Sequence, residues 1–315
     1  MHLSACRAFA VALVTLLVAG CGTAPSDAPG TGRATNQPTE TPIETPTVTP
    51  TDQPTAEPPA EGERGPGLVF YVGERARTGE LRLFARPAPA SSDGGPLAAV
   101  RAATAVEPDD PDLRTLWGGD AVSSIGFDGI GDDGEFSVRL ADDSATTALP
   151  GMTPREAELA VQQVVWTLQS TGTKAPVAFY VGGSSRPLAS VLGVPATGPR
   201  GTYVAEDPAD VLNHVAVLEP AEGAAVEGKV VLTGVAESFE GTVGIRAVDS
   251  SGTRVHDYST TAEQCCGRLW PWRYVLDTTG WEPGTYVVEA RTDDPVGIAA
   301  GSDGPEVDTR TIVVG

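Results

Sequence analysis

The pattern of apolar and polar positions divides the chain into three stretches. An apolar run at 8–19 is followed by a long polar stretch at 22–64, in which Ile43 and Val48 are the only large apolar residues. After residue 64, short apolar runs alternate with polar, glycine-containing turns. Folded structure is therefore expected only after residue 64, because burial of apolar surface must offset the entropy of ordering the chain.

Between residues 65 and 204, the pattern predicts strands mixed with two helices. Strands are predicted at the short apolar runs 67–74, 81–88, 121–129, 134–142 and 175–183. A helix is predicted at 96–106, which opens with Pro and is rich in Ala, and a second at 153–172. We expect an α+β domain, in which helices cover one face of a mixed sheet.

The helix at 153–172 has the clearest pattern. Thr153 and Glu156 have the spacing of a capping box, and Gly172 ends the helix. Its apolar residues recur with the helical period, at Val161, Val164, Val165 and Leu168. This periodicity predicts one apolar face that packs on the sheet.

Residues 212–315 form an all-β pattern. Apolar and polar residues alternate in several short runs, as at Val243, Ile245 and Ala247 and again at Trp272, Tyr274 and Leu276. The sequence DSSG at 249–252 predicts a hairpin turn. This spacing is typical of a β-sandwich of about 100 residues. The cysteine pair that joins the sheets of antibody domains is missing, so burial alone has to hold this core.

The first folded segment, 65–204, resembles a known domain. The sequences LVFYVGE, PLAAVRA, DPDLRTLW, AELAVQQVVWTL and PVAFYVGG occur in the order found in the GerMN domain of sporulation and germination lipoproteins. The resemblance implies an extracytoplasmic, non-catalytic assembly domain, and it brings no catalytic residues to this chain.

The second folded segment, 212–315, is similar to the immunoglobulin-like domain of bacterial spore germination. The resemblance rests on LEPAEGAAVEGKVVLTGVAESFEGTV, PGTYVVEA and SDGPEVDTRTIVV. It implies a binding or assembly module without an active site. The sequence AEQCCGRLWPW departs from the expected pattern, because it places two cysteines side by side.

The N-terminus has the features of a bacterial lipoprotein signal peptide, residues 1–20. Arg7 precedes the apolar run at 8–19, which is too short to span a membrane, and LVAGC at 17–21 resembles a lipobox. We expect Cys21 to receive a diacylglycerol, whose two acyl chains (palmitate is typical) hold the protein on the extracytoplasmic face of the cell membrane. The alternative is an ordinary secretory signal with a chance cysteine.

The stretch at 21–64 is predicted to be a disordered tether. Pro and Thr dominate it, and proline favours extended polyproline II conformations. It would serve as a spacer between the lipid and the folded domains. Thr-Pro stretches are also sites of O-glycosylation, which is the alternative role.

The chain is acidic, with a net charge of −21 from 21 Lys and Arg against 42 Asp and Glu. Such a surface is repelled by nucleic acid, which excludes nucleic-acid binding as a function. The acidic residues Asp128, Asp132, Asp133 and Glu135 lie close together, but their spacing differs from that of a calcium loop. We therefore predict no metal and no cofactor.

Two cysteines remain after Cys6 leaves with the signal and Cys21 is acylated. Cys265 and Cys266 are adjacent, about 3.8 Å apart at Cα, which is below the usual disulfide range of about 4.4–6.8 Å. A strained vicinal disulfide, two free thiols and an intermolecular bridge all remain open. The vicinal disulfide would give the protein a redox-sensing function.

No catalytic motif is found, and only His214 and His256 remain after the signal. We predict that the protein is not an enzyme. Among the tryptophans, Trp272 and Trp281 are expected at the sandwich core, whereas Trp270 is the expected exposed contact for a partner or a glycan.

The function that these features favour is a membrane-anchored, extracytoplasmic binding or assembly module of the cell envelope. Its partner would be an envelope protein or a cell-wall polymer. The alternatives are a cell-wall-modifying enzyme, which would need a nucleophile and a base in reach, and a redox-sensing envelope protein that uses the pair Cys265 and Cys266.

Overall fold

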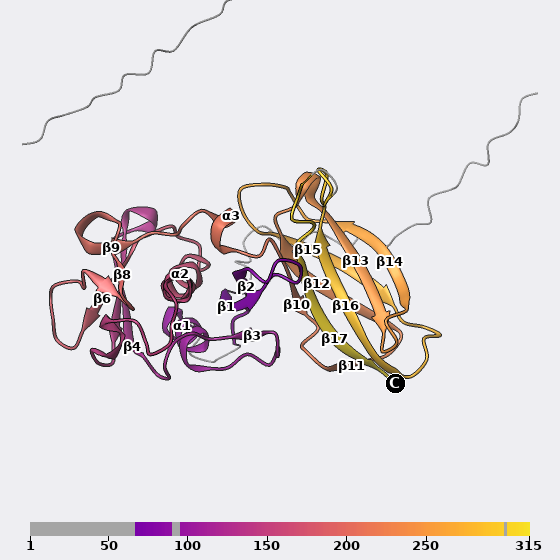
Figure 1. Cartoon of the computed structure of the whole chain (residues 1–315), viewed down its shortest axis with the longest axis horizontal. Coiled ribbons are helices and arrows are strands. Elements are labelled where there is room, and N and C mark those ends of the chain that lie inside the picture. The colour runs from indigo at the N-terminus through magenta and orange to yellow at the C-terminus, as the bar shows by residue number, and fades with distance from the viewer. Residues whose placement is uncertain (1–66, 90–94, 299–300) are drawn as a thin grey trace, which may run out of the picture. The chain divides into compact units, whose positions relative to one another are not determined.

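The structure, a computed structural model, describes residues 67–89, 95–298 and 301–315 (Figure 1). The predicted signal peptide, Cys21 and the predicted tether lie outside these residues. All of the described residues belong to one compact unit. Within these ranges, no helix is both long enough and apolar enough to cross a membrane.

A four-stranded mixed sheet forms one side of the α/β region, residues 67–204. The strands β4 (Val122–Asp128) and β5 (Glu135–Leu140) form the predicted hairpin. The strand β6 (Val177–Val181) runs parallel to β5, and β9 (Thr202–Tyr203) pairs antiparallel with β6. Alternate residues of this sheet point into a common core, which includes Phe136, Val138, Leu140, Val177 and Phe179.

Two helices cover this face of the mixed sheet, as predicted. They are α1 (Pro96–Ala105) and α2 (Pro154–Gln169). The Thr153 hydroxyl accepts a hydrogen bond from the Glu156 amide, and the Glu156 carboxylate accepts one from the Thr153 amide, so the capping box is confirmed. The expected apolar face of α2 is also confirmed, because its residues Val161, Val164, Val165 and Leu168 are buried in the sheet's core.

A second, three-stranded sheet lies on the other side of the helices, which the sequence pattern alone did not predict (Figure 1). It consists of β1 (Leu68–Glu74), β2 (Leu81–Pro87) and the short β3 (Leu113–Arg114), in the order β2-β1-β3. Both faces of β1 and β2 are buried. The alternation of Arg82 and Arg86 with apolar residues in β2 therefore does not mark a solvent-exposed face, because both arginines are buried like their apolar neighbours.

Several short elements were also not predicted from the sequence. They are β7 (Ser190–Val191), β8 (Val194–Pro195), β9, β3, the helix α3 (Pro208–Val211), and 3-10 turns at Gly131–Asp133, Ser144–Thr146, Pro199–Gly201 and Phe239–Gly241. Elements of two to four residues are too short to show a periodic pattern, and tertiary contacts decide them.

Residues 215–314 form the predicted β-sandwich. One sheet has the order β10-β12-β15 and the other β11-β17-β16-β13-β14. The strands are β10 (Val215–Glu219), β11 (Ala224–Val226), β12 (Lys229–Ala236), β13 (Thr242–Asp249), β14 (Arg254–Thr261), β15 (Trp270–Asp277), β16 (Gly284–Thr292) and β17 (Val307–Val314). A shared core between the sheets includes Leu232, Ile245, Trp272, Leu276 and Ile312.

An apolar cluster joins the α/β region to the sandwich. Phe70, Leu83 and Leu159 from the first pack with Leu212 of the connecting segment and with Val235 from the second. Asn213 fixes this junction with its polar groups: its amide N–H donates to the Leu83 carbonyl, and its side chain donates to the carbonyls of Val215 and Val307. This cluster and these hydrogen bonds therefore join the two regions, which correspond to the sequence segments 65–204 and 212–315.

Candidate functional site

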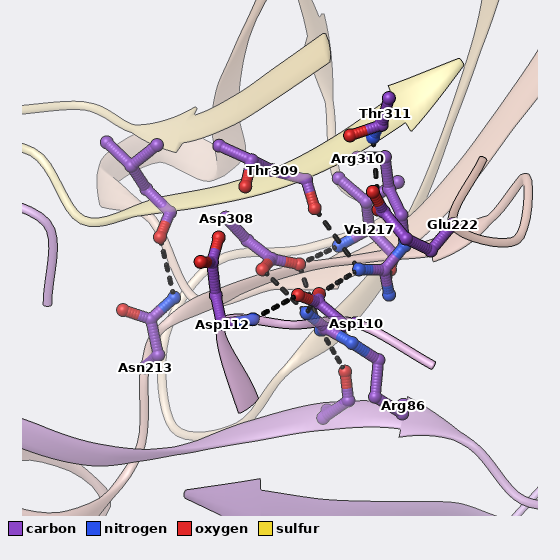
Figure 2. Close-up of polar contacts among 12 residues, drawn as sticks. Arg86, Asp110, Asp112, Asn213, Val217, Glu222, Asp308, Thr309, Arg310 and Thr311 are labelled. Carbon is purple, nitrogen blue, oxygen red and sulfur yellow. Dashed lines mark hydrogen bonds and ion pairs between the residues drawn. The ribbon is translucent and has the colours of Figure 1, made fainter. Parts of the chain in front are cut away.

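Four buried charged residues meet where the α/β region contacts the sandwich (Figure 2). We call them the ion network: Arg86 of β2, Asp110 in the turn before β3, and Asp308 and Arg310 of β17. The Arg86 guanidinium donates to both oxygens of Asp308, at 2.9 and 3.0 Å, and to Asp110 at 2.6 Å. Arg310 donates to the same Asp110 oxygen at 2.5 Å.

Backbone groups form further hydrogen bonds with the charged side chains of the ion network. The Val217 amide of β10 donates to Asp308 at 2.7 Å, and the Val217 carbonyl accepts from Arg310 at 2.8 Å. The Asp112 amide donates to Asp110 at 3.0 Å. Two arginines and two aspartates balance in charge, which is what allows all four to be buried.

The pKa values reflect this pairing. Burial alone would raise the pKa of Asp110, but the charge and hydrogen bond of Arg86, with help from the Asp112 amide and Arg310, bring it below its ordinary value. Burial would lower the pKa of Arg86, but Asp308 and Asp110 raise it instead. Arg86 and Asp110 are therefore held in their charged forms.

A cleft of about 360 Å³ opens beside the ion network. Its walls include Glu74, Asp112 and Arg114, as well as Arg86 and Asp308. The pKa of Asp112 is raised, first by burial and then by the nearby carboxylates. Because Arg86 is already bound by two carboxylates, the cleft does not offer it to an anionic ligand, and we assign the ion network a structural role.

A second group of polar features lies on the sandwich, at the edges of its two sheets. The edge strand β14 of the larger sheet contacts the edge strand β15 of the smaller one. His256 and Tyr258 of β14 stand on the same side of the sheet as the core residues Ala247 and Ile245, with which they are paired. Ile245 is fully buried, whereas Tyr258 is 66% exposed. The larger sheet thus extends beyond the smaller one and leaves this part of its inner face open.

Aromatic rings follow one another from this open edge into the core. We call Tyr258, His256, Tyr274 and Trp281 the aromatic cluster. Ring centroids are 4.7 Å apart for His256 and Tyr258, 5.5 Å for His256 and Tyr274, and 6.5 Å for His256 and Trp281. Trp281 packs in turn on the buried Tyr286 at 4.7 Å. The core therefore supports the exposed rings.

Burial keeps two members of the aromatic cluster, His256 and Tyr274, uncharged. His256 Nε2 and the Tyr274 hydroxyl are 2.9 Å apart. Burial lowers the pKa of His256, and burial followed by the nearby Tyr258 raises the pKa of Tyr274. Both groups are consequently neutral near pH 7. The cluster offers ring faces next to neutral hydrogen-bonding groups, in a chain whose surface is otherwise strongly acidic.

The loop between β14 and β15 presents the two adjacent cysteines. Cys265 and Cys266 are both exposed, free thiols. Trp270 Nε1 donates to the Cys266 carbonyl at 3.2 Å, and the Arg268 guanidinium lies over the Trp270 ring at 3.6 Å from its centroid. One face of Trp270 is therefore occupied, and its predicted role as a partner or glycan contact stays a prediction. Trp272 and Trp281 pack in the sandwich, as expected.

The acidic residues of the β4–β5 hairpin stabilise loops. Asp132 accepts hydrogen bonds from the Lys174 amide at 2.6 Å and the Thr173 hydroxyl at 3.1 Å, and Glu135 pairs with Arg200 at 3.3 Å. Among the described residues, no group of three or more His, Cys, Asp or Glu side chains is arranged to hold a metal ion.

Sequence reasoning missed both the ion network and the aromatic cluster. The four charged residues of the network are far apart in sequence, and each one alone resembles a solvated surface charge. The sequence does contain one indication of the aromatic cluster. In RVHDYST, after the turn at 249–252, His256 and Tyr258 alternate with polar residues. That alternation marks one face of a strand, but it does not reveal that the opposite sheet ends short of it.

Two family models match the chain, in the order that the sequence suggested. Residues 69–186 match the family described as sporulation and spore germination, and residues 214–299 match the immunoglobulin-like domain of bacterial spore germination. Both matches lie inside the predicted segments 65–204 and 212–315. They confirm the resemblance to both domain families. No curated protein matches the chain.

Solved structures resemble the chain only weakly. CopC from Methylosinus trichosporium OB3b is 19% identical, with 32% of this chain and 93% of CopC covered and a TM-score of 0.22. An endo-beta-1,4-mannanase from Thermotoga petrophila is 12% identical, with 51% of this chain and 35% of the mannanase covered and a TM-score of 0.26. These scores are too low to support an argument about function.

Proposed function

Because the chain carries a sporulation and spore germination domain followed by an immunoglobulin-like domain of spore germination, we propose that it is a lipid-anchored binding module of the bacterial cell envelope. It acts outside the cytoplasm and catalyses no reaction of its own. Its ligand is a glycan of the cell wall, and the aromatic cluster of the sandwich is where that glycan binds.

The observation that carries this proposal is the composition of the aromatic cluster. Sugar rings present C–H groups on their faces and hydroxyls around their rims, so they bind where an aromatic face lies next to neutral donors and acceptors. Tyr258 supplies an exposed ring, and His256 and Tyr274 supply polar groups within 5.5 Å between ring centroids. A neutral ligand also avoids the repulsion that a net charge of −21 imposes on anionic ones.

The junction between the two regions supports a role in positioning. The ion network and the apolar cluster around Leu83, Leu159 and Val235 restrain the sandwich relative to the α/β region. A ligand held by the sandwich is therefore held at a fixed place relative to the other domain. This arrangement suits a module that brings a second partner, bound to the α/β region, close to the wall.

The anchor completes the proposal. Cys21 carries the lipid, and the Pro- and Thr-rich stretch after it provides the reach from the membrane to the wall. Membrane and wall would then be bridged by a single chain.

The experiment is a sedimentation assay with the full-length protein, purified in detergent, and isolated insoluble cell-wall glycan. We expect the protein to sediment with the glycan while the supernatant gains no soluble sugar fragments. Release of fragments would identify an enzyme instead, and protein that stays in the supernatant would contradict glycan binding. Cellulose of the same particle size is the control for nonspecific adsorption.

A further inference from the structure

The loop that joins β14 to β15 holds its two cysteines in a defined arrangement. The Gly267 amide donates to a Glu237 carboxylate oxygen at 2.7 Å, and the Cys266 carbonyl accepts from Trp270 Nε1 at 3.2 Å. Trp270 packs against the sandwich core and is covered by Arg268. Contacts on both sides of Cys266 therefore fix the backbone of the loop, while both thiols stay exposed.

The backbone at Cys266 departs from an extended conformation. Its φ is +68°, in the left-handed region that residues with a Cβ rarely adopt. In an extended chain, successive side chains point to opposite sides, which would separate the two sulfurs. The left-handed turn at Cys266 removes this alternation, so the two exposed thiols are not forced to opposite sides of the loop.

We propose that Cys265 and Cys266 are a thiol–disulfide exchange site that closes into a vicinal disulfide by reacting with a low-molecular-weight disulfide, RSSR. One thiolate attacks RSSR, forms a Cys–S–SR bond and releases RS⁻. The second thiolate then attacks the protein sulfur of that bond, forms the Sγ–Sγ bond and releases a second RS⁻. The dithiol loses two electrons and two protons, and RSSR is reduced to two RSH.

Both thiols are exposed, so both are open to a disulfide in solution. Either one can make the first attack as its thiolate, and the other then closes the ring. The reverse reaction with two RSH restores the dithiol, so the site responds to the thiol–disulfide balance around it.

This inference goes beyond the proposed function and depends on it only for the oxidising compartment in which RSSR would be met. The test needs no glycan and no membrane. It is made with the full-length protein in detergent, reduced, freed of reductant, and incubated under nitrogen with glutathione disulfide. Remaining thiols are then blocked with iodoacetamide. Trypsin should release residues 255–268, a peptide that contains only these two cysteines.

In the wild-type protein we expect the unalkylated peptide, lighter by two hydrogens than its dithiol form, with release of two glutathione molecules per chain. In Cys266→Ser we expect a single mixed disulfide with glutathione at Cys265, because the second step is lost. A wild-type peptide that carries two iodoacetamide groups, two glutathiones, or a bond to another chain would overturn the proposal.

A synthetic peptide of residues 255–268 is the matched control for the role of the fold. Under the same conditions, we expect the peptide to accumulate the mixed disulfide, whereas the folded protein proceeds to the ring. Equal accumulation in both would overturn the claim that the loop positions the thiols.

Discussion

The guanidinium of Arg86 and the carboxylate of Asp308 form a two-point ion pair between β2 of the α/β region and β17 of the sandwich. The residues are separated by 222 positions in sequence, and both are almost completely buried. Asp110 also binds Arg86, and Arg310 binds Asp110 in turn, so the four charges form one chain of ion pairs. This contact, together with the apolar cluster beside it, joins the two regions.

Replacing Asp308 with Ala should destabilise the protein strongly. The substitution removes the carboxylate that pairs with the buried Arg86, and it leaves the Val217 amide without its hydrogen-bond acceptor. Removing one member of a buried ion pair costs about 3–5 kcal/mol. Urea unfolding measures this loss. The control is Arg254→Ala, which breaks an exposed pair with Asp257 and should cost no more than about 1 kcal/mol. Similar losses for both variants would contradict a structural role for the ion network.

The ion network should also make the free energy of unfolding depend on pH. The pKa of Asp110 is lower in the folded protein than its ordinary value of 3.8. Its contribution is therefore present above that ordinary value and is lost as the pH falls through the lower, folded value. Asp110→Asn should lower the free energy of unfolding near pH 7 and reduce its decline on acidification.

Asp112 provides the control for this prediction, because its pKa is shifted in the opposite direction. The folded protein disfavours the ionised form of Asp112, so this group opposes stability above its raised pKa. Asp112→Asn should leave the free energy of unfolding near pH 7 unchanged or slightly higher. A loss of stability in Asp112→Asn as large as in Asp110→Asn would contradict the assignment.

Gly234 of β12 should not tolerate a side chain. A Cβ atom there would lie 2.0 Å from the Ala216 carbonyl oxygen and 2.3 Å from the Trp272 ring, both in the packed sandwich. We expect Gly234→Ala to lose about 3 kcal/mol of stability, as in other overpacked cores. Gly284→Ala is the control, since a Cβ at this strand position has no neighbour within 4 Å. A thermal melt that does not separate the two variants would refute this packing.

The elements with a strong periodic pattern were predictable from sequence. The capping box of α2 and its apolar face at Val161 and Leu168 are both present, and so is the hairpin turn at 249–252. In each case, neighbours within a few residues determine the structure. The division into an α+β region and a β-sandwich follows from the same local patterns.

The contacts between regions could not be predicted in this way. Arg82 and Arg86 alternate with apolar residues, a pattern that normally indicates one solvated face. Here the second face is buried because helices and the sandwich cover both sides of β2. The exposure of Tyr258 has the same origin, since it depends on where the opposite sheet ends and not on the sequence of β14.

The lipid anchor has its own test. We predict that Cys21→Ser moves the protein from the membrane fraction to the soluble fraction after cell lysis, because no acyl chain can then be attached. Immunoblots of both fractions measure this change. Cys265→Ser is the control and should stay with the membrane. A Cys21→Ser protein that remains in the membrane fraction would refute lipid attachment at this residue.

The most direct test of glycan binding is the affinity of two variants of β14 for insoluble cell-wall glycan, measured by sedimentation of the full-length protein. Tyr258→Ala removes the exposed ring, which we expect to cost about 1 kcal/mol, or about five-fold in affinity. Val255→Ala shortens an exposed apolar side chain of the same strand that is not one of the rings of the aromatic cluster, and it should bind like the wild type. Equal affinity of Tyr258→Ala and the wild type would contradict binding at the aromatic cluster.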